Sequence, residues 1–137
     1  MAHHVFPVRV YYEDTDHSGV VYHANYLKYF ERAREHLLGP EELVRLLEED
    51  GIGFVVVKAA LRYRDGARFG DVIEVRSTAK QGSPYRAVFV QEAWRPGATK
   101  AAVEAEIELC TVDREGRLVR LPAGVVARVE ALLSAAG

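Results

Sequence analysis

The sequence is poor in the features that mark secreted, metal-binding, membrane and nucleic-acid-binding chains. Its single cysteine, Cys110, excludes an intrachain disulfide framework and a cysteine-based zinc site, and it is consistent with a reducing compartment. No segment reaches the roughly 18 apolar residues that a membrane-spanning helix requires, and the first residues lack the pattern of a signal peptide. The formal net charge is only −2, with Lys and Arg spread along the chain, which disfavours nucleic-acid binding. We therefore expect a cytoplasmic chain without a membrane span.

What is present is the composition of an ordinary globular domain. Hydrophobic residues make up 49% of the sequence and charged residues 28%. A length of 137 residues supports one domain with one sizeable core. Because no internal repeat, linker or low-complexity segment interrupts it, we expect residues 1–137 to form a single domain.

The chain is organised around residues 11–38. A short polar loop, which carries two acids and a histidine, is followed by Gly19 and then by a strongly amphipathic pattern. From about Tyr22, apolar residues recur at steps of three and four until Gly39-Pro40. This spacing predicts one long helix packed along a single face. The acids of the loop would then lie beside the N-terminus of that helix, where unpaired N–H groups favour negative charge.

The remaining segments predict a short helix, several strands and a terminal helix. In the last long strand, Val103, Ala105 and Ile107 alternate with glutamates, which indicates a sheet with one buried face. A series of meandering strands curled around one long helix is an α+β arrangement. The expected ranges are a first strand over 5–12, a short helix over 41–50, strands over 54–63, 72–80, 85–94 and 101–112, a short strand extension over 117–121, and a final helix opened by Pro122.

The run from Tyr12 to Tyr26 reads Y-E-D-T-D-H-S-G-V-V-Y-H-A-N-Y, and a K-Y-F-E-R-A-R segment follows it. This pattern resembles the hot-dog-fold acyl-CoA thioesterases of the 4-hydroxybenzoyl-CoA thioesterase class, especially the subgroup associated with the Tol–Pal system. The close match covers roughly residues 8–38, and the rest fits in order and length of elements. The resemblance implies a single hot-dog domain, in which an antiparallel sheet wraps around one long helix. It also implies hydrolysis of an acyl-CoA to a free acid and coenzyme A without a cofactor.

Asp16 is the leading candidate for a catalytic carboxylate. A carboxylate in a loop beside a helix start could attack a thioester carbonyl as a nucleophile or activate water as a general base. Backbone N–H groups near Tyr22 and His23 would hold the oxyanion. Without the resemblance, the alternative is an ordinary loop or capping acid. The resemblance places the family's catalytic carboxylate at Asp16 and its backbone donor near His23.

Other residues of the motif have candidate roles beside Asp16. His23 could donate a hydrogen bond to the substrate carbonyl or protonate the leaving thiolate, or it could be a polar residue of the first helical turn. Gly19 would let the loop turn sharply and bring its backbone close to the acyl group. Tyr12, Tyr26 and Asn25 are candidates for substrate binding, although Tyr26 has the spacing of a core residue and Asn25 could instead bond the loop.

Coenzyme A carries phosphates, so cationic partners are expected on or beside the strands. Arg62 and Arg64 are the candidates assigned to substrate binding, and each could equally be a solvated surface charge. The wider set of cationic candidates is Lys58, Arg62, Arg64, Arg68 and Arg86.

No metal site is expected. His3 and His4 are predicted to lie in a frayed terminus, and the acids and histidines of the loop lack the helical i, i+4 pairing of zinc peptidases. The sequence also contains no P-loop, no G-x-S-x-G elbow and no G-x-G-x-x-G turn. Phosphoryl transfer, serine hydrolysis and dinucleotide binding therefore have no support.

Two other functions remain open beside thioester hydrolysis. A hot-dog dehydratase or hydratase would use a histidine and an acid in a different motif, which this sequence does not resemble. A non-catalytic scaffold that binds a ligand or partner would keep the fold alone. Because one hot-dog domain leaves a sheet edge open, the resemblance also implies a homo-oligomer, a dimer or a tetramer, with sites shared between subunits. The acyl group could be aromatic or aliphatic, because pocket depth is a tertiary property.

Overall fold

The computed structural model describes residues 3–136, and its centre is one antiparallel sheet. The strand order is β1-β3-β4-β5-β2, and β6 pairs with β5. Every strand pair is antiparallel. The elements are β1 (His4–Arg9), the 3-10 turn η1 (Tyr12–Asp14), α1 (Asn25–Leu38), α2 (Pro40–Asp50), β2 (Gly53–Tyr63), β3 (Val72–Ser83), β4 (Arg86–Trp94), β5 (Val103–Val112), β6 (Leu118–Val119) and α3 (Ala123–Ala136).

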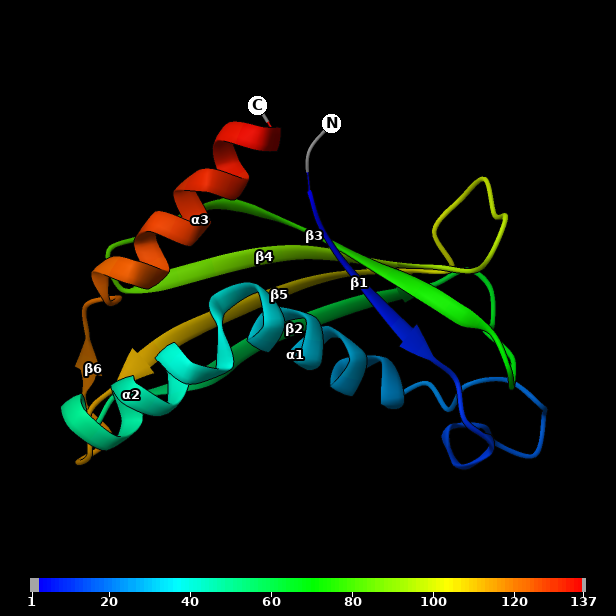
Figure 1. Cartoon of the computed structure of the whole chain (residues 1–137), viewed down its shortest axis with the longest axis horizontal. Coiled ribbons are helices and arrows are strands. Elements are labelled where there is room, and N and C mark those ends of the chain that lie inside the picture. Colours follow the sequence, from blue (N-terminus) through cyan, green and yellow to red (C-terminus); the bar gives the residue numbers. More distant parts are fainter. Residues whose placement is uncertain (1–2, 137) are drawn as a thin grey trace.

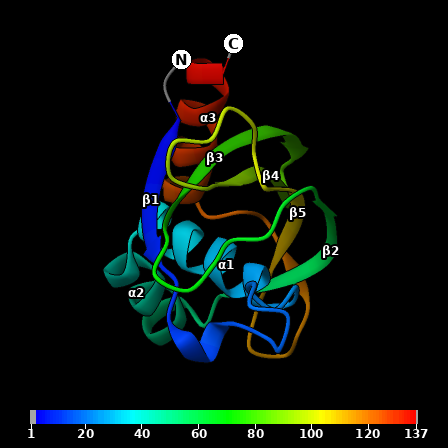
Figure 2. The same ribbon diagram turned by 90° about the vertical axis from the view of Figure 1, so that its right-hand side faces the viewer.

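The sheet curves around α1, as Figure 2 shows. Helix α1 buries residues at steps of three and four, including Tyr26, Phe30 and Leu37, against the inner face of the sheet. Phe30 and Phe89 are both 0% exposed, and burial of one such side chain stabilises a fold by about 1.5–3 kcal/mol. The predicted α+β class, with an antiparallel sheet wrapped around one long helix, is confirmed.

A buried polar network fixes the position of α1 against the sheet. The guanidinium Nη1 of Arg34 donates to Gln91 Oε1 over 2.9 Å. The amide nitrogen of Gln91 donates in turn to the Phe30 carbonyl and to Ser77 Oγ, each over 3.0 Å. Burial lowers the pKa of Arg34. Because buried polar groups require partners, sliding the helix along the sheet would break the two bonds that join α1 to Gln91, so the network fixes the position of α1 against β4.

Two predicted element boundaries are wrong at the N-terminal side. Helix α1 begins at Asn25 and not near Tyr22, because the Tyr22 N–H donates to the Asp14 carbonyl (2.9 Å) and not into a helical turn. The first strand ends at Arg9 and not at residue 12, because Tyr12–Asp14 form a 3-10 turn. The predicted end of the long helix at Gly39 is confirmed, with Gly39 at a φ of 95°.

Strand β2 forms one edge of the sheet, and its exposure differs from the sequence interpretation. An apolar run such as Phe54-Val55-Val56-Val57 at the start of β2 predicts a buried strand, yet Val55, Val56 and Val57 are 42%, 48% and 43% exposed. The reason is that β2 pairs only with β5 among the described residues and leaves its other side open. An exposed apolar edge strand is a surface that another chain can cover.

The start of β1 and the end of α3 lie close together (Figure 1 and Figure 2), and a histidine pair fastens the first strand. His4 Nε2 and His36 Nδ1 are 2.9 Å apart, which joins β1 to the C-terminal half of α1. The prediction that His4 lies in a frayed terminus is therefore wrong. None of the helices within residues 3–136 is long and apolar enough to cross a membrane.

The His4–His36 contact predicts that acid destabilises the fold. Burial lowers the pKa of His4, and the nearby His36 and Arg128 lower it further. Below about pH 6.5, His4 is therefore more fully protonated in the unfolded chain than in the folded chain. Stability is expected to fall as the pH drops from 7.5 to 5.5. The effect of His4 is expected to be small because part of the ring remains in water.

Urea unfolding at both pH values would measure this effect. His4→Gln is expected to reduce the difference in unfolding free energy between pH 7.5 and 5.5, whereas His17→Gln, at an exposed position, should leave it unchanged. An equal pH dependence in wild type and His4→Gln would contradict the assignment to His4.

Candidate active site

The loop between β1 and α1 is a tight hairpin. Thr15 and Val21 form an isolated antiparallel bridge, and the Asp16 N–H donates to the Val20 carbonyl over 2.9 Å. At the tip, the Gly19 N–H donates to the Asp16 carbonyl over 3.0 Å. Gly19 has a φ of +82°, which a residue with a side chain rarely adopts. The D-T-D-x-x-G spacing thus folds into a defined turn that holds Asp16 near its tip.

The Asp16 side chain is half-buried and has one oxygen available. Its Oδ1 accepts a hydrogen bond from the Ser18 N–H over 2.8 Å, which fixes the rotamer of the carboxylate. Its Oδ2 has no hydrogen-bond partner within residues 3–136. An oriented carboxylate with one free oxygen could act as a nucleophile or accept a proton from water.

Asp14 has a structural role in the same loop. Its Oδ2 accepts the Tyr11 N–H over 2.8 Å, and its carbonyl accepts both the Tyr22 N–H and Asn25 Nδ2, each over 2.9 Å. Burial and the nearby Asp14 carboxylate raise the pKa of the Tyr29 hydroxyl. Asp14 therefore fastens the loop to the start of α1. Asn25, a candidate for substrate binding, uses its side-chain amide in this fastening.

The amides that remain free at the helix start are one residue later than expected. The Tyr22 N–H was expected in the oxyanion site and the Gly19 backbone close to the acyl group, but these two N–H groups already donate to the carbonyl oxygens of Asp14 and Asp16. In the described part of the chain, the N–H groups of His23 and Ala24 have no acceptor. They immediately precede α1, where the helix dipole adds partial positive charge. This pair of amides can bind an oxyanion.

Tyr63 is a candidate that the sequence interpretation missed. Its hydroxyl donates to the His23 carbonyl over 2.9 Å, and its ring meets the His23 ring edge-on at 6.2 Å between centroids. Burial raises the pKa of Tyr63, so the hydroxyl keeps its proton at neutral pH. The only sequence signal was its place at the end of the alternation of β2, which suggests an inward-facing side chain but not its partner.

The two tyrosines predicted to bind substrate lie in different environments. Tyr26 is only 2% exposed, and its hydroxyl accepts the Ala67 N–H over 3.1 Å, so it belongs to the core of the single chain. Tyr12 is 78% exposed and contacts the edge of Phe69 with its ring. Of the two, only Tyr12 is open to a ligand in the single chain.

Several predicted cationic partners already have counter-ions. Arg64 lies 3.4 Å from Glu104, and Arg86 lies 3.0 Å from Glu108. Arg62 lines a shallow groove on the outer face of the sheet together with Lys80 and several glutamates. The structure therefore brings together the loop and the helix start, but it does not gather these cations into one cluster.

An apolar cavity of about 420 Å³ lies at the other end of the molecule from the Asp16 loop. In Figure 1 that loop is at the right-hand end of α1, whereas α2, which lines the cavity, is at the left-hand end. Polar groups occur at its helical wall, where Arg34 is buried and Glu31 is exposed. The apolar lining residues are Leu38, Leu43, Leu47, Ile52, Phe54, Val56 and Leu109.

Metal-ligating side chains do not gather at this site or elsewhere between residues 3 and 136. No group of three or more His, Cys, Asp or Glu side chains there is close enough to hold a metal ion. The available chemistry consists of a carboxylate, two free amides and the His23 imidazole.

The curved antiparallel sheet around one long helix defines the hot-dog class of folds. A family profile described as the thioesterase-like superfamily matches residues 10–129. This chain therefore belongs to the thioesterase-like superfamily.

Its relatives carry names that agree with this family. The acyl-CoA thioesterase YbgC of Haemophilus influenzae is 40% identical over 110 residues, which cover 79% of this chain and 79% of that protein. The acyl-CoA thioester hydrolase YbgC of Escherichia coli O6:H1 is 38% identical over 109 residues, which cover 79% and 81%. Among solved structures, a probable thioesterase from Bartonella henselae aligns with a TM-score of 0.81 and 31% identity, over 88% of this chain and all of that one.

Proposed function

We propose that this chain is an acyl-CoA thioester hydrolase whose catalytic carboxylate is Asp16. The observation that carries the proposal is the free oxygen of Asp16 in a rigid hairpin, held beside a helix start with two unpaired amides. The relatives named as acyl-CoA thioesterases support the reaction class. The finer place within the family, the 4-hydroxybenzoyl-CoA class and its Tol–Pal-associated subgroup, is part of the proposal and rests on the D-T-D-x-x-G-V-V-Y-H motif.

The reaction is addition to the thioester carbonyl followed by loss of the thiolate. Asp16 either takes a proton from the attacking water or attacks the carbonyl itself, giving an anhydride that water then opens. The amides of His23 and Ala24 donate to the oxygen that becomes negative. The carbon–sulfur bond breaks and the thiolate takes a proton, for which His23 is the candidate acid. The products are the free acid and coenzyme A, and the balance requires only water.

We further propose that the working unit is at least a dimer joined through β2. The exposed valines of this edge strand can be covered by the same strand of a second copy. An antiparallel pairing centred near Lys58 would place the start of one β2 beside the end of the other. The apolar cavity at the start of β2 would then lie next to the partner's Asp16 loop, so each site would combine a carboxylate from one chain with an acyl pocket from the other.

The same proposal extends to the assembly, the domain organisation, the cellular compartment and the residues that bind substrate. A tetramer would form from two such dimers. One domain would contain every catalytic residue that a chain contributes. The free, buried Cys110 suits a reducing compartment such as the cytoplasm. We also propose that Tyr12, Arg62 and Arg64 bind substrate, because each side chain is exposed and can reach a ligand outside the chain.

Release of free thiol from a panel of short, long and aromatic acyl-CoAs tests the proposed function. Turnover of at least one of them is expected, with the matching free acid detected by mass spectrometry. Binding of acyl-CoA without any turnover on the whole panel would contradict hydrolysis and favour a non-catalytic scaffold with the same fold.

A further inference from the structure

A single tyrosine connects the edge strand β2 to the peptide that precedes α1. Tyr63 is the last residue of β2, and its hydroxyl donates to the His23 carbonyl over 2.9 Å. Its ring also meets the ring of Tyr26 at 5.9 Å, and Tyr26 is buried in the core. Tyr63 is 46% exposed, but the contact with Tyr26 on one side and the bond to the His23 carbonyl fix its ring between the core and the turn, so Tyr63 is well placed to orient that turn.

The acceptor of this bond belongs to the same peptide unit as a free amide. The His23 carbonyl and the Ala24 N–H are the two ends of one planar trans peptide, so they point in opposite directions. Fixing the carbonyl toward Tyr63 turns the Ala24 N–H away from β2. This N–H has no acceptor among the described residues. The orientation of an oxyanion donor therefore depends on the hydroxyl of Tyr63.

A hydrogen bond accepted at a carbonyl also polarises its peptide. Hydrogen bonds in a chain strengthen one another, so the Ala24 N–H becomes a better donor when the His23 carbonyl accepts a hydrogen bond from the Tyr63 hydroxyl. The gain is greatest for an acceptor that carries full negative charge, because charge-assisted hydrogen bonds are about twice as strong as neutral ones. A bound thioester carbonyl is neutral, and the oxygen of the tetrahedral state is not.

We propose that Tyr63 is a positioning residue that orients and polarises the peptide between His23 and Ala24 for the oxyanion of the reaction. It touches neither water nor thioester in this role and acts through the peptide. The inference rests on the proposed function, since it assigns a residue to the reaction proposed there. It places part of the catalytic apparatus on the edge strand, which the D-T-D-x-x-G motif does not include.

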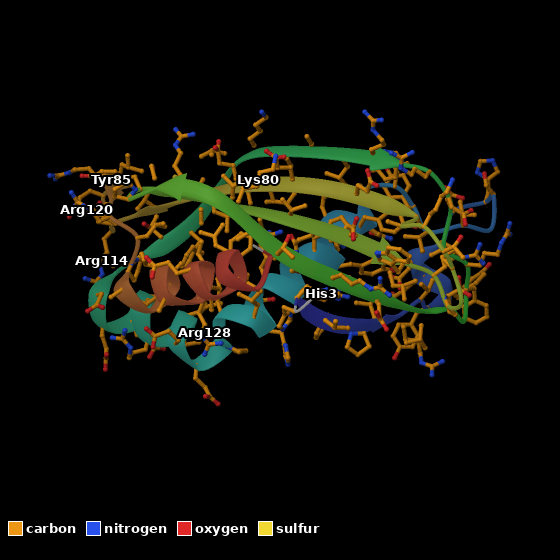
Figure 3. All side chains as sticks on the ribbon, turned by 90° about the horizontal axis from the view of Figure 1, so that it is seen from above. His3, Lys80, Tyr85, Arg114, Arg120 and Arg128 are labelled. Carbon is orange, nitrogen blue, oxygen red and sulfur yellow. The ribbon has the colours of Figure 1, made fainter. Side chains whose placement is uncertain are left out.

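Tyr63→Phe removes only the hydroxyl and keeps the ring that packs against Tyr26. Because the bond matters most in the transition state, kcat is expected to fall about tenfold while KM changes less than about twofold. Tyr85→Phe is the matched control. Tyr85 lies beside Arg120 at the far end of the sheet, as Figure 3 shows, and its ring contacts the Arg120 guanidinium at 5.4 Å. This control should keep the kcat and KM of the wild type.

Two inhibitors separate positioning from a general loss of structure. A trifluoromethyl ketone analogue of acyl-CoA, which forms a tetrahedral adduct, should bind Tyr63→Phe about tenfold more weakly than wild type. The corresponding CoA thioether, which cannot form an oxyanion, should bind both equally. In addition, the carbonyl 13C shift of His23 and the amide 15N shift of Ala24 should move in Tyr63→Phe and not in Tyr85→Phe.

The possible outcomes are distinguishable. An active wild type with an equally active Tyr63→Phe overturns the inference alone. An equal loss of affinity for both inhibitors also overturns it, because Tyr63 would then contact the bound substrate. A wild type that hydrolyses no acyl-CoA overturns the proposed function and this inference with it.

Discussion

Replacement of Asp16 by asparagine is expected to lower kcat by a factor of about 100 or more, which corresponds to roughly 3 kcal/mol of transition-state stabilisation. Asparagine retains an oxygen that can accept the Ser18 N–H, so the hairpin should keep its shape. What is lost is the negative charge and the basic oxygen. The measurement is thiol release from the best acyl-CoA of the panel, together with a thermal unfolding curve of each variant.

His17→Gln is the matched control for this variant. His17 is the next residue of the same hairpin, and its side chain is exposed. It should therefore retain the activity of the wild type within about twofold, whereas Asp16→Asn does not. If Asp16→Asn kept its activity with an unchanged unfolding curve, the catalytic carboxylate would have to be another residue.

The second large effect is expected from mixing two impaired variants. Gly53 lines the apolar cavity, and a Cβ added there meets no atom within 4 Å. The Cβ of Gly53→Phe should therefore meet no clash, and its ring is expected to occupy the cavity and lower kcat/KM at least about tenfold on acyl groups that bind there. If each site combines the carboxylate of one chain with the acyl pocket of its partner, Asp16→Asn damages the part of the site supplied by one chain. Gly53→Phe damages the part supplied by the other chain.

Co-expression of the two variants in equal amounts tests this arrangement. Random pairing makes about half of the dimers mixed, and each mixed dimer has one intact site, so about a quarter of wild-type activity should return. In the control mixture of Gly53→Phe with His17→Gln, every carboxylate is intact. This mixture should therefore show only the activity of the sites whose pocket is not filled. Mixed Asp16→Asn and Gly53→Phe protein that stays as inactive as either variant would show that carboxylate and pocket belong to one chain.

The local pattern of the chain predicted most of the fold. Steps of three and four placed the buried face of α1, and Gly39-Pro40 correctly marked its end because the glycine adopts a positive φ there. The start of α1 could not be placed from periodicity, because Tyr22 has an apolar ring at a helical spacing. Its N–H is instead bonded to Asp14 across the hairpin, which is a contact between backbones that leaves no trace in the sequence.

The limits of prediction at the site have the same cause. The motif made Asp16 the candidate carboxylate, and the structure supplies the reason why one of its oxygens is held and the other is free. The free amides are those of His23 and Ala24, and not those of Tyr22 and His23, because the Tyr22 N–H is bonded within the loop. Tyr63 lies 40 residues from His23, so only the tertiary fold brings them together. The valines of β2 were interpreted as buried because an apolar run does not say whether its cover comes from the same chain.

The most direct test of the account is hydrolysis in 18O-labelled water, followed for wild type and Asp16→Asn on the same acyl-CoA. Over many turnovers, wild type is expected to release thiol and acid in equal amounts, with a new 18O atom in the acid whether Asp16 acts as a base or as a nucleophile. Asp16→Asn is expected to form neither product above about one hundredth of the wild-type rate. Labelled acid formed equally fast by Asp16→Asn, or thiol released by wild type without labelled acid, would contradict the account.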